Sequence, residues 1–375
     1  MNDPFLTFDE LRNAYLRYLD SPFWLRYPAL IEGRRKLLDQ DRQLYRDPLF
    51  EPIVPYESSG MTARAACLQL GVPQEVAEYL ESGGLFPAER ELFQHQFDAW
   101  SASRSGEAVV VTTGTGSGKT ECYLLPVFAS LVEESAGWEA PSDRSARALW
   151  WNYRNQQRIA QRAHDTGRAK ALRAIFLYPL NALIEDQLGR IRRACDSTNG
   201  RTWLSTKRNG NSFWFGRYTG STPVSGPETN ASKRQELKRR MKDMESKWDR
   251  ARLSAARSGS DEILSYFQDP QGSEMWSRWD MHENPPDILI TNYSMLNIML
   301  MRSLEGTIFD QTRDWLASDR TRNRFHLIVD ELHTYRGTPG TEVGYLLRAL
   351  LHRLGLTPDS TQLRIITTSA SIEAN

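Results

Sequence analysis

The chain has 375 residues, of which 40% are hydrophobic and 25% charged, so it is long enough for two or three globular domains. Lysine plus arginine and aspartate plus glutamate both number 47, which excludes a uniformly basic nucleic-acid binder but allows a local basic groove. No stretch approaches ~18 consecutive apolar residues, and the N-terminus is acidic where a signal peptide would be basic. We therefore expect a cytoplasmic protein with no membrane partner. Cys67, Cys122 and Cys195 lie far apart, which predicts reduced core residues.

Residues 1–84 predict an N-terminal helical region. Apolar side chains such as Leu11, Tyr15 and Leu19 recur at helical spacing, and Pro48 and Pro55 break the pattern into an extended connector. We expect a structural or partner-docking role for this region, the alternative being a site of chemistry.

From residue 85 to residue 375 the pattern changes to short apolar runs that alternate with helical stretches. The runs cover residues 108–111, 174–178, 288–291, 325–329 and 363–367. Strands of this kind are buried on both faces, so they predict an α/β fold with a parallel sheet flanked by helices. Two polar insertions, at about 136–170 and 224–284, interrupt the alternation.

The two insertions leave two interpretations open. The first is basic and contains the adjacent pair Trp150 and Trp151, and the second carries mixed charges at helical spacing. Such stretches are typical of solvated helical faces. The alternative is a strand-guiding or partner-binding arm, in which arginine supplies charge and tryptophan supplies stacking.

The segment TGTGSGKT at residues 113–120 predicts a phosphate-binding loop, because it follows an apolar strand and precedes an apolar helix. Its glycines let the backbone aim N–H groups at phosphate oxygens, and the helix dipole adds to the attraction. Lys119 can reach the β- and γ-phosphates, and the Thr120 hydroxyl can bind Mg²⁺. Thr113 stands where the strict pattern has glycine. The predicted ATP-binding residues are Thr113, Gly114, Thr115, Gly116, Ser117, Gly118, Lys119 and Thr120.

A second acidic element follows the apolar run Phe325–Val329. Asp330 is placed to hold Mg²⁺ through water, and Glu331 to act as general base on the hydrolytic water. His333 then stands where it can sense the γ-phosphate. ATP and Mg²⁺ are therefore the expected ligands.

With these motifs, residues 85–375 resemble the first RecA-like lobe of superfamily-two helicases of the DExH kind. The resemblance implies that Gln96, in the segment Leu92–Gln96, reads the adenine edge and that Phe86 stacks on the base. It also assigns Ser369, Ala370 and Ser371 to the motif that couples hydrolysis to lobe movement. Ser371 replaces the usual threonine there, which keeps a hydroxyl but departs from the family pattern.

The resemblance implies nucleic-acid contacts in three loops, YPLNAL at 178–183, YTGSTP at 218–223 and TNYSML at 291–296. Strand ends followed by helix N-termini present N–H groups to phosphates without sequence preference. On the residues alone, the first is also a strand end with a helix cap and the third an asparagine-capped helix start. Arg336 either contacts DNA or braces the ATP site. The predicted contacts are Pro179, Asn181, Gln187, Thr219, Gly220, Thr291, Asn292 and Arg336.

Within the superfamily the motifs look most like YprA-type DNA helicases, which are related to RecQ and often carry a cysteine-rich MZB domain. The segment LYRDPLFEPIVPYESS is similar to phage-defence members of the Druantia, DISARM and Dpd kinds. The resemblance implies an ATP-dependent DNA helicase or translocase that acts on single-stranded DNA, or on duplex with a single-stranded end, with other defence proteins as partners. An RNA helicase and a nucleotide-dependent scaffold subunit are the alternatives.

The resemblance also implies a second RecA-like lobe, which completes the ATP site with arginine fingers. The sequence given ends at Asn375, shortly after the coupling motif. We expect that lobe in a longer protein or on another chain. We also expect the chain by itself to bind ATP–Mg²⁺ weakly and hydrolyse it slowly.

Overall fold

The structure is a computed structural model of the chain, and it describes every residue except 1–2, 23, 41, 47–54, 115, 144–147, 155, 336 and 371–375. It divides into two compact units, Met1–Pro55 and Tyr56–Asn375. The sequence placed a boundary near residue 84 instead. Residues 56–84 belong with the larger unit because α3 (Ala63–Gln69) and α4 (Gln74–Ser82) bury side chains such as Cys67 and Tyr79 in its main core.

The first unit is a pair of helices, α1 (Pro4–Asp20) and α2 (Pro28–Leu38). The Asp3 side chain accepts a hydrogen bond from Phe5 N and so caps α1, and Asp20 forms ion pairs with Arg34 and Arg35 of α2. The predicted helices are present, but within the described part of this unit Leu16 alone among the apolar side chains is buried.

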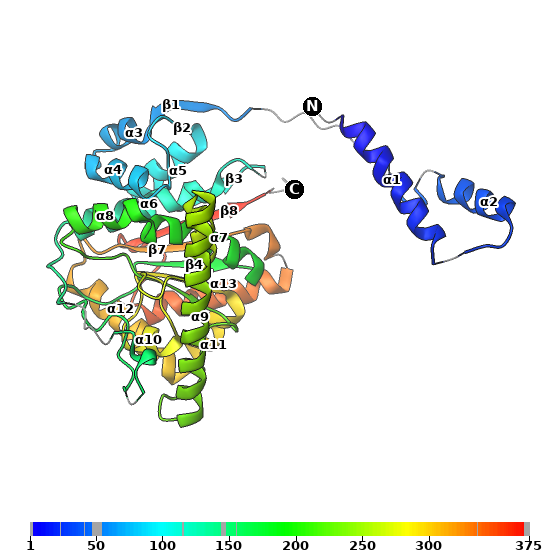
Figure 1. Cartoon of the computed structure of the whole chain (residues 1–375). Helices are drawn as coiled ribbons and strands as arrows, with labels where there is room; N and C mark the ends of the chain where they lie inside the picture. The colour runs from blue at the N-terminus through cyan, green and yellow to red at the C-terminus, as the bar shows by residue number, and fades with distance from the viewer. Residues whose placement is uncertain are drawn as a thin grey trace. The chain divides into compact units, whose positions relative to one another are not determined.

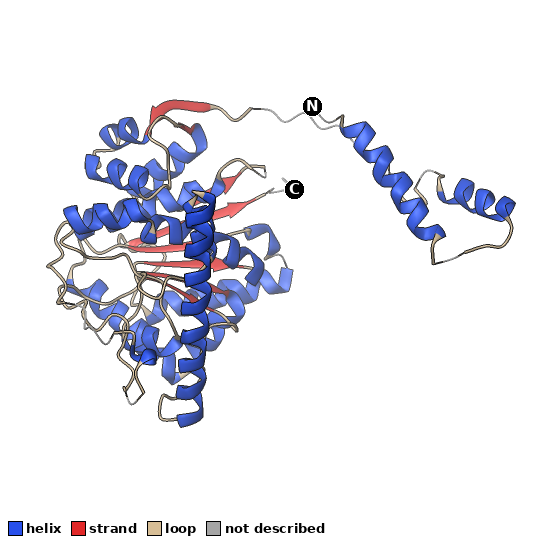
Figure 2. Ribbon diagram, in the orientation of Figure 1, coloured by secondary structure: helices blue, strands red, loops and turns tan. Residues whose placement is uncertain are grey.

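The second unit is built on a parallel sheet of six strands, which confirms the predicted α/β fold (Figures 1 and 2). The strands lie in the order β3-β8-β7-β4-β6-β5, so the chain crosses over between neighbours. Their bounds are β3 Val109–Thr112, β4 Ala174–Tyr178, β5 Phe215–Tyr218, β6 Ile288–Asn292, β7 Phe325–Val329 and β8 Leu363–Ser369. The sequence did not predict β5, since Gly216 and Arg217 interrupt its apolar pattern.

Helices cover both faces of the sheet, because successive strand residues point to opposite sides. On β4, Phe176 packs in one core cluster and Ile175 and Leu177 in the other. The first face is covered by α5 (Gln94–Ser105), α6 (Lys119–Ser135), α7 (Asn181–Asp196) and α8 (Thr198–Lys207). The second face is covered by α11 (Tyr293–Met301), α12 (Gly306–Ser318) and α13 (Gly337–Arg353).

A small antiparallel sheet joins the start of this unit to α5. Strand β1 (Ser58–Thr62) pairs with β2 (Glu91–Phe93), which immediately precedes α5. The sequence did not predict this pair, because its partners are about thirty residues apart and neither alternates clearly.

The two insertions pack against each other and form a third apolar cluster. Trp150 and Trp151, in the short 3₁₀ helix η1 (Trp150–Asn152), meet Leu237 and Met241 of α9 (Ala231–Ser258) together with Trp276. Both adjacent tryptophans are buried, so the interpretation in which they stack on a nucleic-acid strand is wrong. The remaining insertion elements are η2 (Asp261–Tyr266) and α10 (Arg278–Glu283).

Ion pairs reinforce the contact between the insertions. Arg158 of the first lies 2.8 Å from Glu228, 2.7 Å from Asp280 and 2.7 Å from Glu283, all in the second.

Over the described part of the chain, none of the helices combines the length and apolar character needed to cross a membrane.

Candidate functional site

The sequence motifs gather along one edge of the sheet. All six strands are parallel, so their carboxyl ends meet at that edge, where ligands of open α/β sheets bind. The ends of β3, β8 and β7 carry the phosphate loop, the coupling motif and the acidic motif, and these strands are neighbours. The ends of β4, β6 and β5 carry the three loops predicted to contact nucleic acid. We call these two parts of the edge the nucleotide half and the nucleic-acid half, after the ligands that the sequence predicts for them.

The phosphate loop turns tightly between β3 and α6. Gly116 and Gly118 adopt φ of 78° and 76°, the left-handed region that glycine tolerates. Lys119 Nζ donates to the Thr113 carbonyl at 3.1 Å, and Thr113 Oγ1 lies 2.5 Å from Ser117 Oγ. These bonds hold the ammonium group over its own loop. Thr115, one of the predicted ATP-binding residues, lies outside the described residues.

Residues at the start of α5 brace the loop. Gln96 accepts a hydrogen bond from Phe93 N at 3.0 Å and donates to the Gly118 carbonyl at 3.0 Å, and His95 Nε2 lies 2.9 Å from the Ser117 carbonyl. The φ of Gly118 favours glycine, and a Cβ there would stand 2.3 Å from Gln96 Nε2 and displace that amide. Because Gln96 is buried and its amide is used within the protein, its reading of adenine stays a prediction.

The structure does not place Phe86 where a base could stack on it. Its ring is fully buried in the main core, and the Arg90 guanidinium lies 5.2 Å from the ring centroid. Tyr56 lies at the loop instead, with its hydroxyl 2.8 Å from where a Cβ on Gly114 would be. The pairing of β1 with β2 brings Tyr56 there, so sequence reasoning had no signal for it.

Tyr56 belongs to an aromatic cluster beside the phosphate loop. Its ring centroid lies 5.6 Å from that of Phe93 and 5.7 Å from that of His95, and the Phe93 and His95 rings stack at 5.6 Å. Tyr56 is half-buried.

The acidic pair follows β7 directly. Thr368 on β8 donates its hydroxyl proton to Asp330, and Glu331 N donates to the same hydroxyl at 3.4 Å. Burial raises the pKa of Asp330, whereas the Thr368 hydrogen bond and, more weakly, the charge of Lys119 oppose the rise. The opposing effect of Lys119 indicates that its ammonium group lies within electrostatic range of this carboxylate. Sequence reasoning missed Thr368, because only the register of β7 against β8 brings it to Asp330.

Glu331 and the coupling motif meet at His333. Glu331 has a φ of 52°, a left-handed conformation that is strained for a residue with a side chain. His333 Nδ1 lies 3.2 Å from Glu331 Oε2 and 3.3 Å from Ser369 Oγ. Ala370 follows at the end of β8, and Ser371 lies outside the described residues.

These residues fit ATP with Mg²⁺. At Gly116 a Cβ would meet nothing within 4 Å, so the space beside this residue of the loop is open. The half-buried Asp330 carboxylate is costly as an anion, and a bound cation would offset that cost. Thr120 and Asp330 supply the oxygen ligands that Mg²⁺ prefers. Lys119 and the loop N–H groups would hold the phosphates.

In the nucleic-acid half, two helix N-termini stand side by side. Asn292 Nδ2 donates to Asn181 Oδ1 at 2.8 Å, and Asn292 Oδ1 accepts from Met295 N at 2.8 Å as the cap of α11. Asn181 begins α7 and is exposed, as is Tyr293, which begins α11. The asparagine-capped helix start predicted at residue 292 is therefore present. Capped helix starts are also suited to phosphates, and the contact with nucleic acid stays a prediction.

Other predicted contacts lie inside the protein. Thr291 is fully buried and donates to the Tyr218 carbonyl at 2.7 Å, Thr219 is buried with its hydroxyl 2.9 Å from Ser221 Oγ, and Gln187 is buried on α7. These three side chains are buried and do not face outward. Of the remaining predictions, Gly220 is exposed, Pro179 is half-buried, and Arg336 lies outside the described residues.

The fold and this site are those expected of the first RecA-like lobe of a superfamily-two helicase. Residues 93–213 match the family of DEAD/DEAH box helicases.

The chain is a homologue of the Druantia protein DruE of Escherichia coli (strain UMEA 4076-1). It is 32% identical over 409 aligned positions, which cover 98% of this chain and 20% of that protein. It is also 25% identical over 125 positions to the uncharacterized ATP-dependent helicase YprA of Bacillus subtilis (strain 168), covering 33% of this chain and 12% of YprA. The chain thus spans at most a fifth of the length of either relative.

Among solved structures, the DUF1998 helicase MrfA bound to DNA covers 86% of this chain with 29% of its own, at 19% identity and a TM-score of 0.45.

Proposed function

We propose that this chain is the ATP-binding part of an ATP-dependent DNA helicase or translocase of the cytoplasm, which serves anti-phage defence or DNA processing. The observation that supports the proposal is that the predicted nucleotide motifs and the predicted nucleic-acid loops all follow strands on one edge of a single parallel sheet. The homology to DruE supports the role in defence.

In the nucleotide half, each residue has a proposed task. Lys119 and the loop N–H groups bind the phosphates, and Thr120 and Asp330 hold Mg²⁺. When bound, Mg²⁺ neutralises charge on the phosphate oxygens. Glu331 accepts the proton of the attacking water. His333 then senses the change through its contact with Glu331 and passes it to Ser369.

Two contacts join the halves and support coupling between them. The Tyr123 hydroxyl on α6 lies 3.0 Å from the Tyr178 hydroxyl at the end of β4, and Arg190 of α7 forms a 3.0 Å ion pair with Glu121 of α6. A shift of α6 on nucleotide binding would therefore act directly on the loop that begins at Pro179. The complementary wall of the ATP site, a second RecA-like lobe, is part of the same proposal.

The test is Glu331→Gln in the full-length protein, with Glu342→Gln on α13 as a control carboxylate. We expect DNA-stimulated ATP hydrolysis to fall at least about a hundredfold, as for loss of a general base, and unwinding to be lost, while ATP still binds. Stimulation by RNA and not by DNA would favour the RNA helicase. Unchanged biological activity of the variant would contradict a motor and favour a nucleotide-dependent scaffold.

A further inference from the structure

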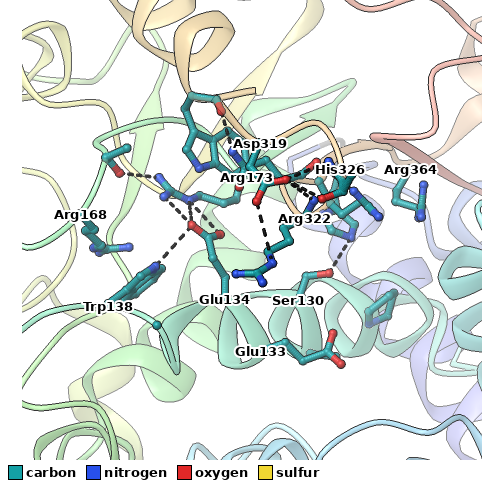
Figure 3. Close-up of a pocket in the computed structure, with 18 of the residues that line it drawn as sticks. Ser130, Glu133, Glu134, Trp138, Arg168, Arg173, Asp319, Arg322, His326 and Arg364 are labelled. Carbon is teal, nitrogen blue, oxygen red and sulfur yellow. Dashed lines mark hydrogen bonds and ion pairs between the residues drawn. The ribbon is translucent and has the colours of Figure 1, made fainter. Parts of the chain in front are cut away.

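A cavity of about 850 Å³ lies at the opposite edge of the sheet from the nucleotide half (Figure 3). It is lined by the last turns of α5 and α6 and by residues that begin β4, β7 and β8. None of the motifs described above reaches it. Its size falls within the range of about 300–1,000 Å³ that is typical of small-molecule sites.

Three basic side chains share the face of the sheet that lines this cavity. Arg324 and His326 are two residues apart at the start of β7, so they point to the same side. Arg364 of β8 is the register partner of His326 and points the same way. All three line the cavity, together with Ser130 of α6.

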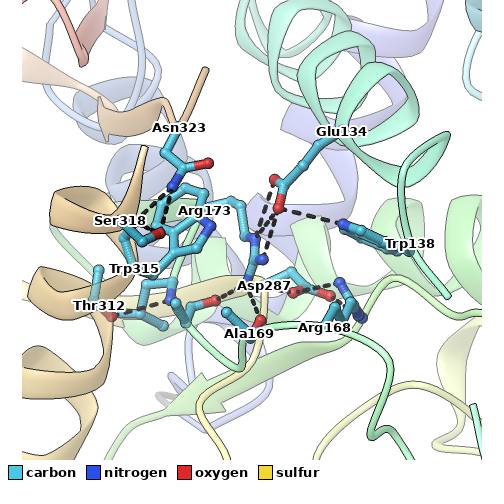
Figure 4. Close-up of polar contacts among 12 residues, drawn as sticks. Glu134, Trp138, Arg168, Ala169, Arg173, Asp287, Thr312, Trp315, Ser318 and Asn323 are labelled. Atoms are coloured by element: carbon cyan, nitrogen blue, oxygen red, sulfur yellow. Dashed lines mark hydrogen bonds and ion pairs between the residues drawn. The ribbon is translucent and has the colours of Figure 1, made fainter. Parts of the chain in front are cut away.

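The neighbouring arginines of the cavity wall are already compensated (Figure 4). Arg173 lies 2.7 Å from Glu134 and 3.3 Å from Asp287, and Arg168 lies 2.9 Å from Asp287. The Arg168 guanidinium also lies 3.5 Å from the ring centroid of Trp138. The charges of these two arginines are already neutralised within the protein, so they contribute little to the binding of an anionic ligand.

Arg324 and Arg364 differ from them. Within the described part of the chain, neither has a carboxylate within ion-pair distance. Arg324 donates to the Asn323 carbonyl at 3.3 Å, and Arg364 donates to the carbonyls of Thr361 at 2.8 Å and Leu363 at 2.9 Å. Both are half-buried. Burial and then the charge of Arg324 lower the pKa of Arg364, so the two cations repel each other without compensation.

His326 adds hydrogen-bonding capacity between them without adding charge. Burial, followed by the charge of Arg364, lowers its pKa to about 3, so the ring is neutral at pH 7. Its Nε2 lies 3.3 Å from Ser130 Oγ.

We propose that this cavity binds a small phosphorylated ligand through Arg324 and Arg364. A phosphate would compensate both cations, and the planar guanidinium matches two phosphate oxygens at once. The volume suits a ligand of about mononucleotide size. The site is separate from the phosphate loop and does not depend on the proposed motor activity.

Calorimetric titration of the full chain with inorganic pyrophosphate tests the proposal. The reference chain and every variant carry Lys119→Ala, so that the phosphate loop contributes little to pyrophosphate binding. We expect Arg324→Gln with Arg364→Gln to weaken binding at least about tenfold, since each charge-assisted contact carries a large share of the affinity. Arg322→Gln is the matched control, because that side chain is 88% exposed at the cavity rim and should change binding little.

A second measurement on the unmodified chain does not depend on folding of the variants. Phenylglyoxal modifies accessible arginines, and mass spectrometry locates the modified residues. We expect pyrophosphate to protect Arg324 and Arg364 but not Arg322. Absence of pyrophosphate binding at millimolar concentration, or equal binding by the double variant, would overturn the proposal. Binding of poly-glutamate without binding of pyrophosphate would also overturn it and assign the cavity to an acidic protein segment.

Discussion

His333 Nδ1 lies 3.3 Å from the Ser369 hydroxyl, so the acidic motif and the coupling motif touch within one lobe. The same imidazole nitrogen lies 3.2 Å from the carboxylate of Glu331. A change of charge at Glu331, the proposed base for the hydrolytic water, would therefore reach the end of β8 through a single side chain, that of His333. This arrangement suits a motor in which hydrolysis must be sensed before it is converted to movement.

Lys119→Ala should abolish detectable ATP binding, or weaken it at least about tenfold, because it removes the charge-assisted contacts of an ammonium group with two phosphates. Calorimetry with ATP and Mg²⁺ measures the affinity, and Lys242→Ala on the exposed side of α9 is the control. An unaltered affinity in Lys119→Ala would refute the assignment of the phosphate loop.

Thr368→Val should make ATP hydrolysis by the full-length protein more sensitive to acid. The Thr368 hydrogen bond lowers the pKa of Asp330, so its loss raises that pKa further. As the pH falls, the carboxylate then takes up a proton, and loses Mg²⁺, at a higher pH than in the wild type. The measurement is the pH profile of hydrolysis at limiting Mg²⁺.

The matched control for that experiment is Thr367→Val, because the Thr367 hydroxyl donates instead to the Val109 carbonyl. If the two valine variants have the same pH profile, the hydrogen bond to Asp330 has no part in holding Mg²⁺.

Asn181→Ala and Asn292→Ala should each weaken binding of single-stranded DNA by the full-length protein. Their mutual hydrogen bond orients two helix N-termini, so a double-mutant cycle should give a coupling free energy of about 0.5–1.5 kcal/mol. Binding is measured by fluorescence anisotropy at fixed salt. Asn297→Ala, which is exposed on the same α11, should have no effect. Strict additivity would show that the pair does not act as a unit.

Trp151→Ala should lower the free energy of unfolding by about 3–5 kcal/mol, as expected for a large buried side chain. The indole is fully buried and donates to Glu245 at 3.0 Å, so truncation leaves a cavity and removes one of the hydrogen bonds that this carboxylate accepts. Urea unfolding measures the change, and hydrogen exchange should increase in α9. Trp24→Ala is the control, since that side chain is 73% exposed. Equal effects of the two changes would contradict a structural role for the insertion cluster.

Stability should decline in acid partly because of His326. Its pKa in the folded chain is about 3, well below the reference value of 6.5. Between those pH values the unfolded chain binds a proton that the folded chain does not. The free energy of unfolding therefore falls by up to about 1.4 kcal/mol per pH unit as the pH drops below 6.5.

His326→Gln should remove that part of the decline, whereas His352→Gln, at an exposed position, should keep it. Urea unfolding at pH 7 and pH 5 measures the difference between the two variants. The same slope in both would mean that His326 is protonated in the folded chain.

The sequence by itself determined the chemistry of the nucleotide half. Lys119, Asp330 and Glu331 stand in short local patterns, each at the end of an apolar run, and such patterns depend on residues that are neighbours in the chain. The parallel α/β fold was predictable for the same reason, because buried strands and amphipathic helices have distinct local periods.

Tertiary structure decided which residues meet across the sheet and which are hidden. Thr368 reaches Asp330 through strand register, and Tyr56 reaches the phosphate loop through the pairing of β1 with β2. Phe86 and Thr291 were plausible contacts by position, yet both are buried. Burial and pairing between distant segments depend on how the layers pack, and a local sequence pattern does not specify that packing.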